Sequence, residues 1–335
     1  MRFSVIIATY NRAEELVKTI ESLKKLESTK PWEVIIVDNN SRDTTRDVVL
    51  KAVDSFPVPL HYLLEKEQGR SAALNAGIRA AKGEILAITD DDVRVDPLWL
   101  RNAEQALERL QCDYVGGKAL PIWSGKIPNW MPNRGGKHWG VIALLDYGPE
   151  PLEFGEKVPL GVNMVFRREC FERAGLWDNS IGRKAGTLLG QEVREWTQRA
   201  RAAGLRGFYS PDLVVHHVIP EDRLTKRYFR RWFYWHGISR AILYQNNRLD
   251  MESPERTALD FSKVPHVAGV PRYLFRTCIH KFFSIWGAMA RRDAIARFED
   301  ELWIWFFAGI LRQRWKDRSV PPAVAGGSTA DIMPD

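Results

Sequence analysis

Short apolar runs in the N-terminal third of the chain alternate with stretches whose apolar residues recur at helical spacing. The runs predict strands over residues 3–8, 33–37, 60–64 and 85–89. Helices are predicted after each of the first three strands, with Leu16, Ile20 and Leu23 on one face of the first. Strands rich in Val, Ile and Leu that alternate with helices are typical of a mostly parallel sheet covered on both faces. The pattern therefore predicts an α/β, Rossmann-like fold.

Two helix starts are marked by residues that favour the beginning of a helix. Asn11 is expected to cap the first helix, with Glu14 completing a capping box. Asp96 and Pro97 are expected to begin another helix, because proline is tolerated at the first helical position.

Polar residues follow each predicted strand. Thr9 and Asn11 follow the first strand, Asp38 follows the second, Arg70 lies beyond the third, and three aspartates, residues 90–92, follow the fourth. In parallel sheets such residues meet at the carboxyl edge, where ligands bind. Three adjacent carboxylates repel one another, so Mg²⁺ or Mn²⁺ is the natural partner. A solvated acidic loop that caps the next helix is the alternative.

The glycine-rich signatures of phosphate binding are missing from the sequence. No G-x-G-x-x-G follows the first strand, and no G-x-x-x-x-G-K-[ST] occurs anywhere. A nucleotide held through a divalent ion remains the best interpretation.

Four motifs resemble those of family 2 glycosyltransferases. They are Ser-Val-Ile-Ile-Ala-Thr-Tyr-Asn-Arg from Ser4, Val-Ile-Ile-Val-Asp-Asn-Asn-Ser-Arg-Asp from Val34, Ala-Leu-Asn-Ala-Gly-Ile from Ala73, and the aspartate triplet. The resemblance covers about residues 1–220. It implies the GT-A fold and inverting transfer of a sugar from a nucleotide sugar, with bound Mn²⁺ or Mg²⁺.

The resemblance also implies roles for the residues of the donor half. Asp38 would read the base or ribose, and Asp90 and Asp92 would serve the ribose and the metal. The donor-binding residues expected in this way are Thr9, Asn11, Asp38, Arg70, Asn75, Asp90 and Asp91.

On the acceptor side, the resemblance places Gly161 and Asn163 near the sugar and diphosphate, with Trp196 nearby. The family usually has Glu-Asp at the start of the helix that follows, whereas this chain has Glu192 and then Val193. Glu192 is therefore the expected general base, with Glu195 in reserve. The alternative is that Glu192 only stabilises the positive end of its helix.

A pair of histidines ends the predicted strand 213–215. Adjacent strand residues point to opposite faces, so at most one of the two faces the site. We expect His217 to complete the metal or diphosphate shell, as the family implies, and His216 to pack against the next helices.

The last hundred residues differ from the rest in composition. Residues 220–318 contain nineteen Lys and Arg against eleven Asp and Glu, a net charge of +8, whereas the whole chain carries +7. Aromatic residues crowd there, but the longest uncharged apolar run, residues 302–311, is about half of what spans a bilayer. Such helices suit the membrane interface. Helices that only pack on the catalytic domain are the alternative; nucleic-acid binding has no support in residues 1–220.

These observations predict a GT-A catalytic domain over 1–219, a helical appendage over 220–318 and a disordered tail over 319–335. The donor half of the catalytic domain would end near residue 117, and the acceptor half would cover 118–219. Three cysteines without metal-like spacing, and no signal peptide before the first strand, predict a cytoplasmic protein. The basic, aromatic appendage predicts that it associates with the inner membrane face.

The predicted function is metal-dependent, inverting sugar transfer to a glycan, polyprenyl-linked or glycolipid acceptor in cell-envelope glycan assembly. The alternative, which Val193 favours, is a catalytically silent module that binds a nucleotide sugar or a glycan. A nucleotidyltransferase would need a basic glycine-rich loop near the first strand, which the sequence lacks.

Overall fold

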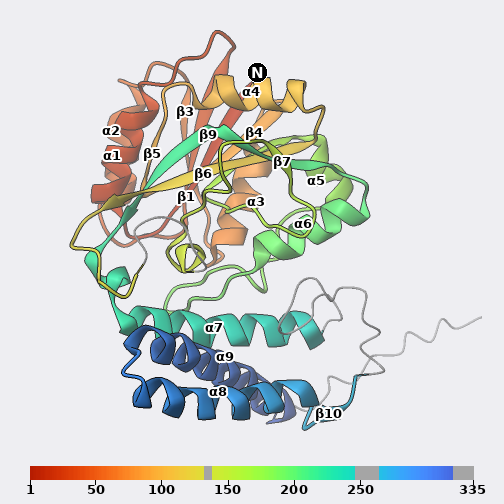
Figure 1. Ribbon diagram of the computed structural model, residues 1–335. Helices are drawn as coiled ribbons and strands as arrows, with labels where there is room; N and C mark the ends of the chain where they lie inside the picture. The colour runs from red at the N-terminus through yellow and green to blue at the C-terminus, as the bar shows by residue number, and fades with distance from the viewer. Residues whose placement is uncertain (132–137, 246–263, 320–335) are drawn as a thin grey trace, which may run out of the picture.

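The computed structural model describes residues 1–131, 138–245 and 264–319 (Figure 1). A central sheet carries helices on both faces, and three helices, α7–α9, lie together beneath it at the bottom of Figure 1. The predicted α/β class, with a mostly parallel sheet and C-terminal helices, is confirmed. The predicted tail lies outside the described residues, except that Ser319 ends α9.

The strands are β1 (Phe3–Thr9), β2 (Trp32–Asp38), β3 (Leu60–Leu64), β4 (Ile85–Asp90), β5 (Val93–Val95), β6 (Tyr114–Trp123), β7 (Leu152–Glu153), β8 (Asn163–Arg167), β9 (Gly207–Ile219), β10 (His266–Val267) and β11 (Val270–Pro271). The helices are α1 (Ala13–Leu23), α2 (Thr45–Val53), α3 (Arg70–Ala80), α4 (Trp99–Arg109), α5 (Glu169–Ala174), α6 (Glu192–Ala202), α7 (Lys226–Gln245), α8 (Arg272–Ala290) and α9 (Ala294–Ser319), with the 3-10 helices η1 (Trp139–Ile142) and η2 (Glu221–Leu224).

The strand order of the main sheet is β3-β2-β1-β4-β8-β6-β9-β5, with β7 paired to β9. The first four strands in this order are parallel, and β8 runs antiparallel between β4 and β6. The chain moves from β1 toward one edge and then returns to place β4 on the other side of β1. This reversal of strand order puts a binding crevice at the carboxyl ends of β1 and β4.

Alternate residues of each central strand face opposite layers of helices. On one face, Val5 and Ile7 join a core with Leu16 of α1 and Leu107 of α4. On the other, Ile6 packs with the residues of α3, α5 and α6. The strands are apolar on both faces because both are covered, and for this reason they read as continuous apolar runs in the sequence.

Two predicted helix starts are wrong by one or two residues. Asn11 does not cap α1, because it adopts a left-handed conformation with φ of 50°. The first-turn N–H of Ala13 is instead bound by a carboxylate oxygen of Asp43, 3.1 Å away. Pro97 precedes α4, which begins at Trp99, and the carboxylate of Asp96 accepts the Leu98 N–H at 2.9 Å.

The C-terminal helices share two apolar cores. Phe229 of α7 and Phe298 and Leu302 of α9 pack with Trp139 and Ile219 of the catalytic region. A second core joins the three helices α7, α8 and α9 to one another. None of the helices within the described residues has the length and apolar composition needed to cross a bilayer.

Candidate active site

The carboxylates of Asp91 and Asp92 meet residues from the end of β1. Thr9 donates its hydroxyl to Asp91 at 2.7 Å. One guanidinium nitrogen of Arg12 lies 3.0 Å from Asp91 and 2.5 Å from Asp92. Burial raises the pKa of Asp91 to about 6, although Arg12 acts in the opposite direction. The predicted repulsion among the aspartates is thus relieved in this structure by an arginine cation.

Asp92 also contacts His217 of β9 and Arg223 of η2. Its Oδ1 lies 3.2 Å from Nε2 of His217, and its Oδ2 lies 3.5 Å from Arg223. Burial opposes ionisation of Asp92, but His217 and the two arginines outweigh it and hold the pKa of this carboxyl well below its usual range. His217 is 1% exposed and faces the site, while the adjacent His216 is half-buried.

The three predicted metal ligands are not brought together. Asp90 is bound by Arg70, and among residues 1–131, 138–245 and 264–319 no three His, Cys, Asp or Glu side chains are arranged to hold an ion. Asp92 and His217, two of the three predicted ligands, have a geometry that fits a shared metal ion. Asp92 Oδ1 has no hydrogen-bond partner among the described residues, and its 3.2 Å separation from His217 Nε2 matches ligands that sit about 2.1 Å from one octahedral ion.

Arg70 links the donor half to the acceptor half. Its guanidinium donates to Asp90 at 2.6 Å and to the carbonyl of Gly161 at 3.0 Å. The same group lies 3.5 Å from the carboxylate of Glu192. A Cβ atom at Gly161 would lie 3.1 Å from Arg70 Nη1, so the glycine allows this close approach.

A cavity of about 770 Å³ opens beside this link. Arg70, Asp90 and Glu192 line one part of it, and Trp232 and His236 of α7 line another. The rings of Trp232 and His236 are stacked with centroids 4.7 Å apart. Burial, with two nearby arginines, holds the pKa of His236 well below its ordinary value, so its imidazole is neutral at pH 7.

The loops after β1 and β2 are tied together. Asp38 accepts the hydroxyl of Tyr62 at 2.9 Å and the N–H of Ser41 at 2.9 Å. Asn11 receives the N–H of Arg42 on its side-chain oxygen at 2.7 Å. These contacts fix two of the predicted donor-binding residues at the same edge of the sheet as Thr9.

Three further residues of the predicted site lie in the core with their polar groups bonded to protein. The Asn75 amide bonds the backbone of Trp177. The Asn163 amide donates to two carbonyls and accepts the indole N–H of Trp99 at 2.9 Å. Trp196 is fully buried, and its N–H donates to a carbonyl. The structure does not bring these side chains to the cavity.

Several site residues had no predicted role. Arg12 ends the motif that begins at Ser4, and no sequence pattern indicates its pairing with Asp91 and Asp92. Arg223 is one of many charged residues after β9. The α7 residues Trp232 and His236 are four positions apart and so share a helix face. This spacing indicates that they are neighbours but not that they line the cavity.

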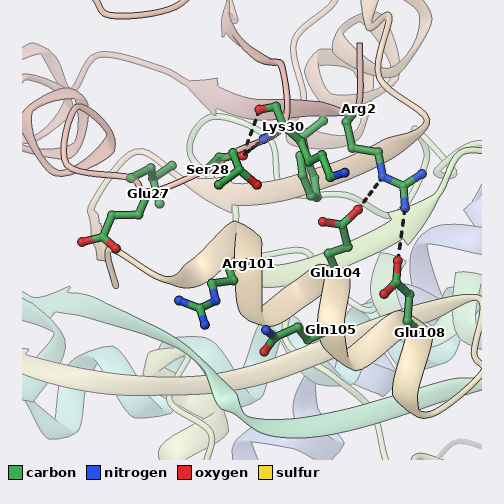
Figure 2. Close-up of a pocket in the computed structure, with 11 residues that line it drawn as sticks. Arg2, Glu27, Ser28, Lys30, Arg101, Glu104, Gln105 and Glu108 are labelled. Atoms are coloured by element: carbon green, nitrogen blue, oxygen red, sulfur yellow. Dashed lines mark hydrogen bonds and ion pairs between the residues drawn. The ribbon is translucent and has the colours of Figure 1, made fainter.

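A second hollow, of about 880 Å³, lies at the opposite end of the sheet (Figure 2). Arg2, directly before β1, lies in it 2.7 Å from Glu104 and 3.7 Å from Glu108. Ligands of α/β sheets bind at the carboxyl ends of the strands, so the cavity beside Glu192 is the candidate site.

The fold and this site are those of an α/β protein with a binding cavity at the carboxyl ends of its strands, and comparisons with known proteins identify its class. The model of the family described as glycosyl transferase family 2 matches residues 4–175. The chain belongs to this family and is a glycosyltransferase.

Two relatives from Haloferax volcanii are similar along most of their length. The chain is 29% identical to glycosyltransferase AglE over 68% of this chain and 70% of that protein. It is 27% identical to a glucosyl-dolichyl phosphate glucuronosyltransferase over 72% of this chain and 77% of that protein.

The fold is similar to that of a solved mannosyltransferase, PcManGT from Pyrobaculum calidifontis, described in complex with GDP-Man and Mn²⁺. The TM-score is 0.62 at 19% identity, with 94% of this chain and 87% of that one covered. The likeness confirms the predicted GT-A fold.

Proposed function

We propose that this glycosyltransferase moves a sugar, with inversion, from a nucleotide sugar to a lipid-linked acceptor in cell-envelope glycan assembly. The observation that carries the proposal is the Arg70 link. It holds Asp90, at the end of a donor-side strand, and Glu192, on the cavity wall, within reach of one guanidinium. A donor and an acceptor that meet there would lie between these two carboxylates.

In the proposed reaction, an acceptor hydroxyl attacks the anomeric carbon from the face opposite the leaving nucleoside diphosphate. Glu192 accepts the hydroxyl proton as the new C–O bond forms. The bond to the diphosphate breaks, and the diphosphate leaves with the electron pair. One carboxylate suffices because no covalent intermediate is needed.

Asp92 and His217 would hold Mn²⁺ or Mg²⁺, with the remaining ligands supplied by diphosphate and water. When bound, such an ion neutralises negative charge on the leaving group. The GDP-Man and Mn²⁺ in the description of the structurally similar mannosyltransferase support this assignment. Thr9, Asn11, Asp38, Asp91 and Arg70 are the proposed contacts of the donor, while Asn75 and Asn163 are proposed to position the loops around it.

The cavity supports an acceptor that carries a phosphate. Arg183 and Arg194 line it and bring two positive charges to its wall. Lys157 lies over the ring of Tyr147 at 5.2 Å on the same wall. The name of the relative glucosyl-dolichyl phosphate glucuronosyltransferase also supports a lipid-linked phosphate, and hence action at the cytoplasmic face of a membrane.

The proposal is tested with a panel of nucleotide sugars, with and without Mn²⁺, followed by transfer to short prenyl-diphosphate sugars. We expect one donor to bind and to be transferred only when Mn²⁺ is present. Asp92→Asn should lose the Mn²⁺-dependent part of donor binding in calorimetry, whereas the exposed control Asp212→Asn should not. Donor binding without transfer to any acceptor would favour the silent module. Equal donor affinity of Asp92→Asn and wild type would contradict the metal assignment.

A further inference from the structure

The outward face of α8 exposes large apolar side chains. The exposed fractions are 60% for Ile279, 54% for Phe282, 67% for Phe283, 60% for Trp286 and 47% for Met289. Their spacing of three and four residues places them on one side of the helix. They form a continuous strip, which is larger than the scattered apolar residues normal on a protein surface.

The opposite face of α8 is the one that packs against α9. Leu274 and Ala288 are fully buried, and Leu274 packs with Phe306 and Phe307 of α9. Lys281 on the same inner side pairs with Asp300 at 2.7 Å. The exposed strip is therefore not a part of the core of the three-helix group.

The charges around the strip are mostly positive, and the acidic residue that follows α8, Asp293, accepts the N–H groups of Ile295 and Ala296 at the start of α9. No Asp or Glu occurs in α8. Arg272 and Arg276 are exposed near its start, and Arg291 and Arg292 are exposed directly after its end. In Figure 1, α8 lies at the bottom of the molecule, on the side of the helical group away from the sheet. The strip is thus flanked by cations and faces away from the catalytic region.

We propose that this face of α8 docks on an anionic lipid bilayer, with Phe283 and Trp286 inserted among the lipids and the arginines at the head groups. The inference rests on the proposed function, in which the acceptor is membrane-borne, and it names the surface that meets the membrane. Aromatic and apolar residues beside Arg are the composition that binds interfaces, and each Arg near an anionic surface adds to the attraction.

A second copy of the chain fits this face less well. A two-fold contact would set α8 of one copy against α8 of the other. Whether the helices ran parallel or antiparallel, the arginines at one end would face arginines of the partner. No acidic residue lies in α8 to offset them, and the carboxylate of Asp293 beyond its end is engaged by the first turn of α9. A bilayer containing anionic lipids supplies the charge that the second copy lacks.

The test uses the full chain and vesicles of phosphatidylcholine, alone or mixed with phosphatidylglycerol. We expect co-sedimentation with the anionic vesicles that weakens with salt, since exposed charges are screened over about 10 Å at 0.1 M ionic strength. Phe283→Ser with Trp286→Ser should weaken binding by at least about tenfold, because two large apolar side chains lose their insertion. Arg272→Gln with Arg276→Gln should reduce the preference for anionic vesicles and its salt dependence.

The control is Val17→Ser with Leu50→Ser. It removes two apolar side chains that are 43% and 44% exposed and lie away from α8, on α1 and α2. It should bind vesicles as wild type does. A wild-type protein that stays in the supernatant at low salt, or an α8 variant that binds normally, would overturn the proposal. A dimer in sedimentation that the Phe283 and Trp286 changes dissociate, without vesicle binding, would make the face a self-interface.

Transfer in detergent separates this inference from the proposed function. There the α8 variant should be as active as wild type on a short prenyl-diphosphate sugar, because docking is no longer needed. If wild type transfers sugar but ignores vesicles, the docking surface is wrong and the function stands. If wild type binds vesicles through α8 but never transfers sugar, the docking surface is supported and the proposed function is wrong.

Discussion

Glu192 and Glu195 lie one turn apart in α6 but have different surroundings. Glu192 lines the cavity, 3.5 Å from Arg70. Glu195 is 2% exposed, and its two oxygens accept from Arg199 at 2.8 and 2.9 Å. A carboxylate already engaged by an arginine and closed off from the cavity is poorly placed to accept a proton from an acceptor. For this reason we propose Glu192 as the base and a structural role for Glu195.

We expect Glu192→Gln to lower the transfer rate by about 10²–10⁴-fold, the usual contribution of a general base. Donor affinity should be unchanged, because the shape of the side chain is kept. Glu195→Gln should retain most of the transfer rate and lower the melting temperature, since Arg199 loses its charged partner. Initial rates, calorimetry with the donor and thermal denaturation separate the two. An active Glu192→Gln enzyme together with an inactive, stable Glu195→Gln enzyme would make Glu195 the base.

Residues at the ends of strands could be predicted, whereas partners distant in sequence could not. The predicted positions of Asp38 and Asp90 at the ends of β2 and β4 are confirmed, because strand ends are readable from apolar runs. Arg12 reaches Asp91 across 79 positions, and Arg223 reaches Asp92 across 131. No local pattern records such pairings, because only the folded sheet brings the two segments together.

Among the helices and strands too, features set by local sequence could be predicted and features set by tertiary contacts could not. The four predicted N-terminal strands are present. β1, β2 and β4 are buried on both faces and are therefore mostly apolar, whereas β3 at the edge of the sheet is partly exposed. Helix starts were less predictable. Asp43, in the loop after β2, accepts the N–H of Ala13 in the first turn of α1, and this tertiary contact takes the place of the local cap predicted at Asn11. Irregular segments such as η1 and β7 gave no periodic signal.

Helices α7 and α9 pack closely through two glycines. A Cβ atom at Gly237 of α7 would lie 1.9 Å from the carbonyl oxygen of Phe306, and one at Gly309 of α9 would lie 1.9 Å from that of Tyr234. Both neighbours are backbone atoms, which cannot move aside without separating the helices. The contact between these two helices therefore depends on the absence of side chains at both positions.

Gly237→Ala should lower the free energy of unfolding by about 1–3 kcal/mol, the usual cost of overpacking. Gly287→Ala in α8 is the control, because its Cβ would meet only the end of the Arg291 side chain, at 3.3 Å. There the change should stabilise by about 0.5–1 kcal/mol, since alanine loses less backbone freedom in a helix. Denaturant unfolding of both variants measures the difference. Equal stability of Gly237→Ala and wild type would mean that the two helices do not approach as closely as described.

On the scale of the whole molecule, the catalytic region and the helical group share an apolar core. Phe229 of α7 is fully buried, and its ring centroid lies 4.9 Å from that of Trp130 and 5.8 Å from that of His138. The same cluster includes Ile219 at the end of β9. The helices also supply part of the cavity wall through Trp232 and His236. The predicted boundary at residue 219 thus separates the sheet from the C-terminal helices, but one apolar core extends over both parts.

This continuity predicts that the two parts unfold together. Calorimetry of the full chain should show one transition, because separating the parts would expose the shared core. Phe229→Ala should lower the free energy of unfolding by about 3–5 kcal/mol, as for large core truncations, and shift the whole transition. Trp315→Ala, at a side chain that is 68% exposed, should change stability by no more than about 0.5 kcal/mol. Two separate transitions, with Phe229→Ala moving only one of them, would show that the helical group is an independent domain and that its contact with the cavity contributes little to the stability of the catalytic fold.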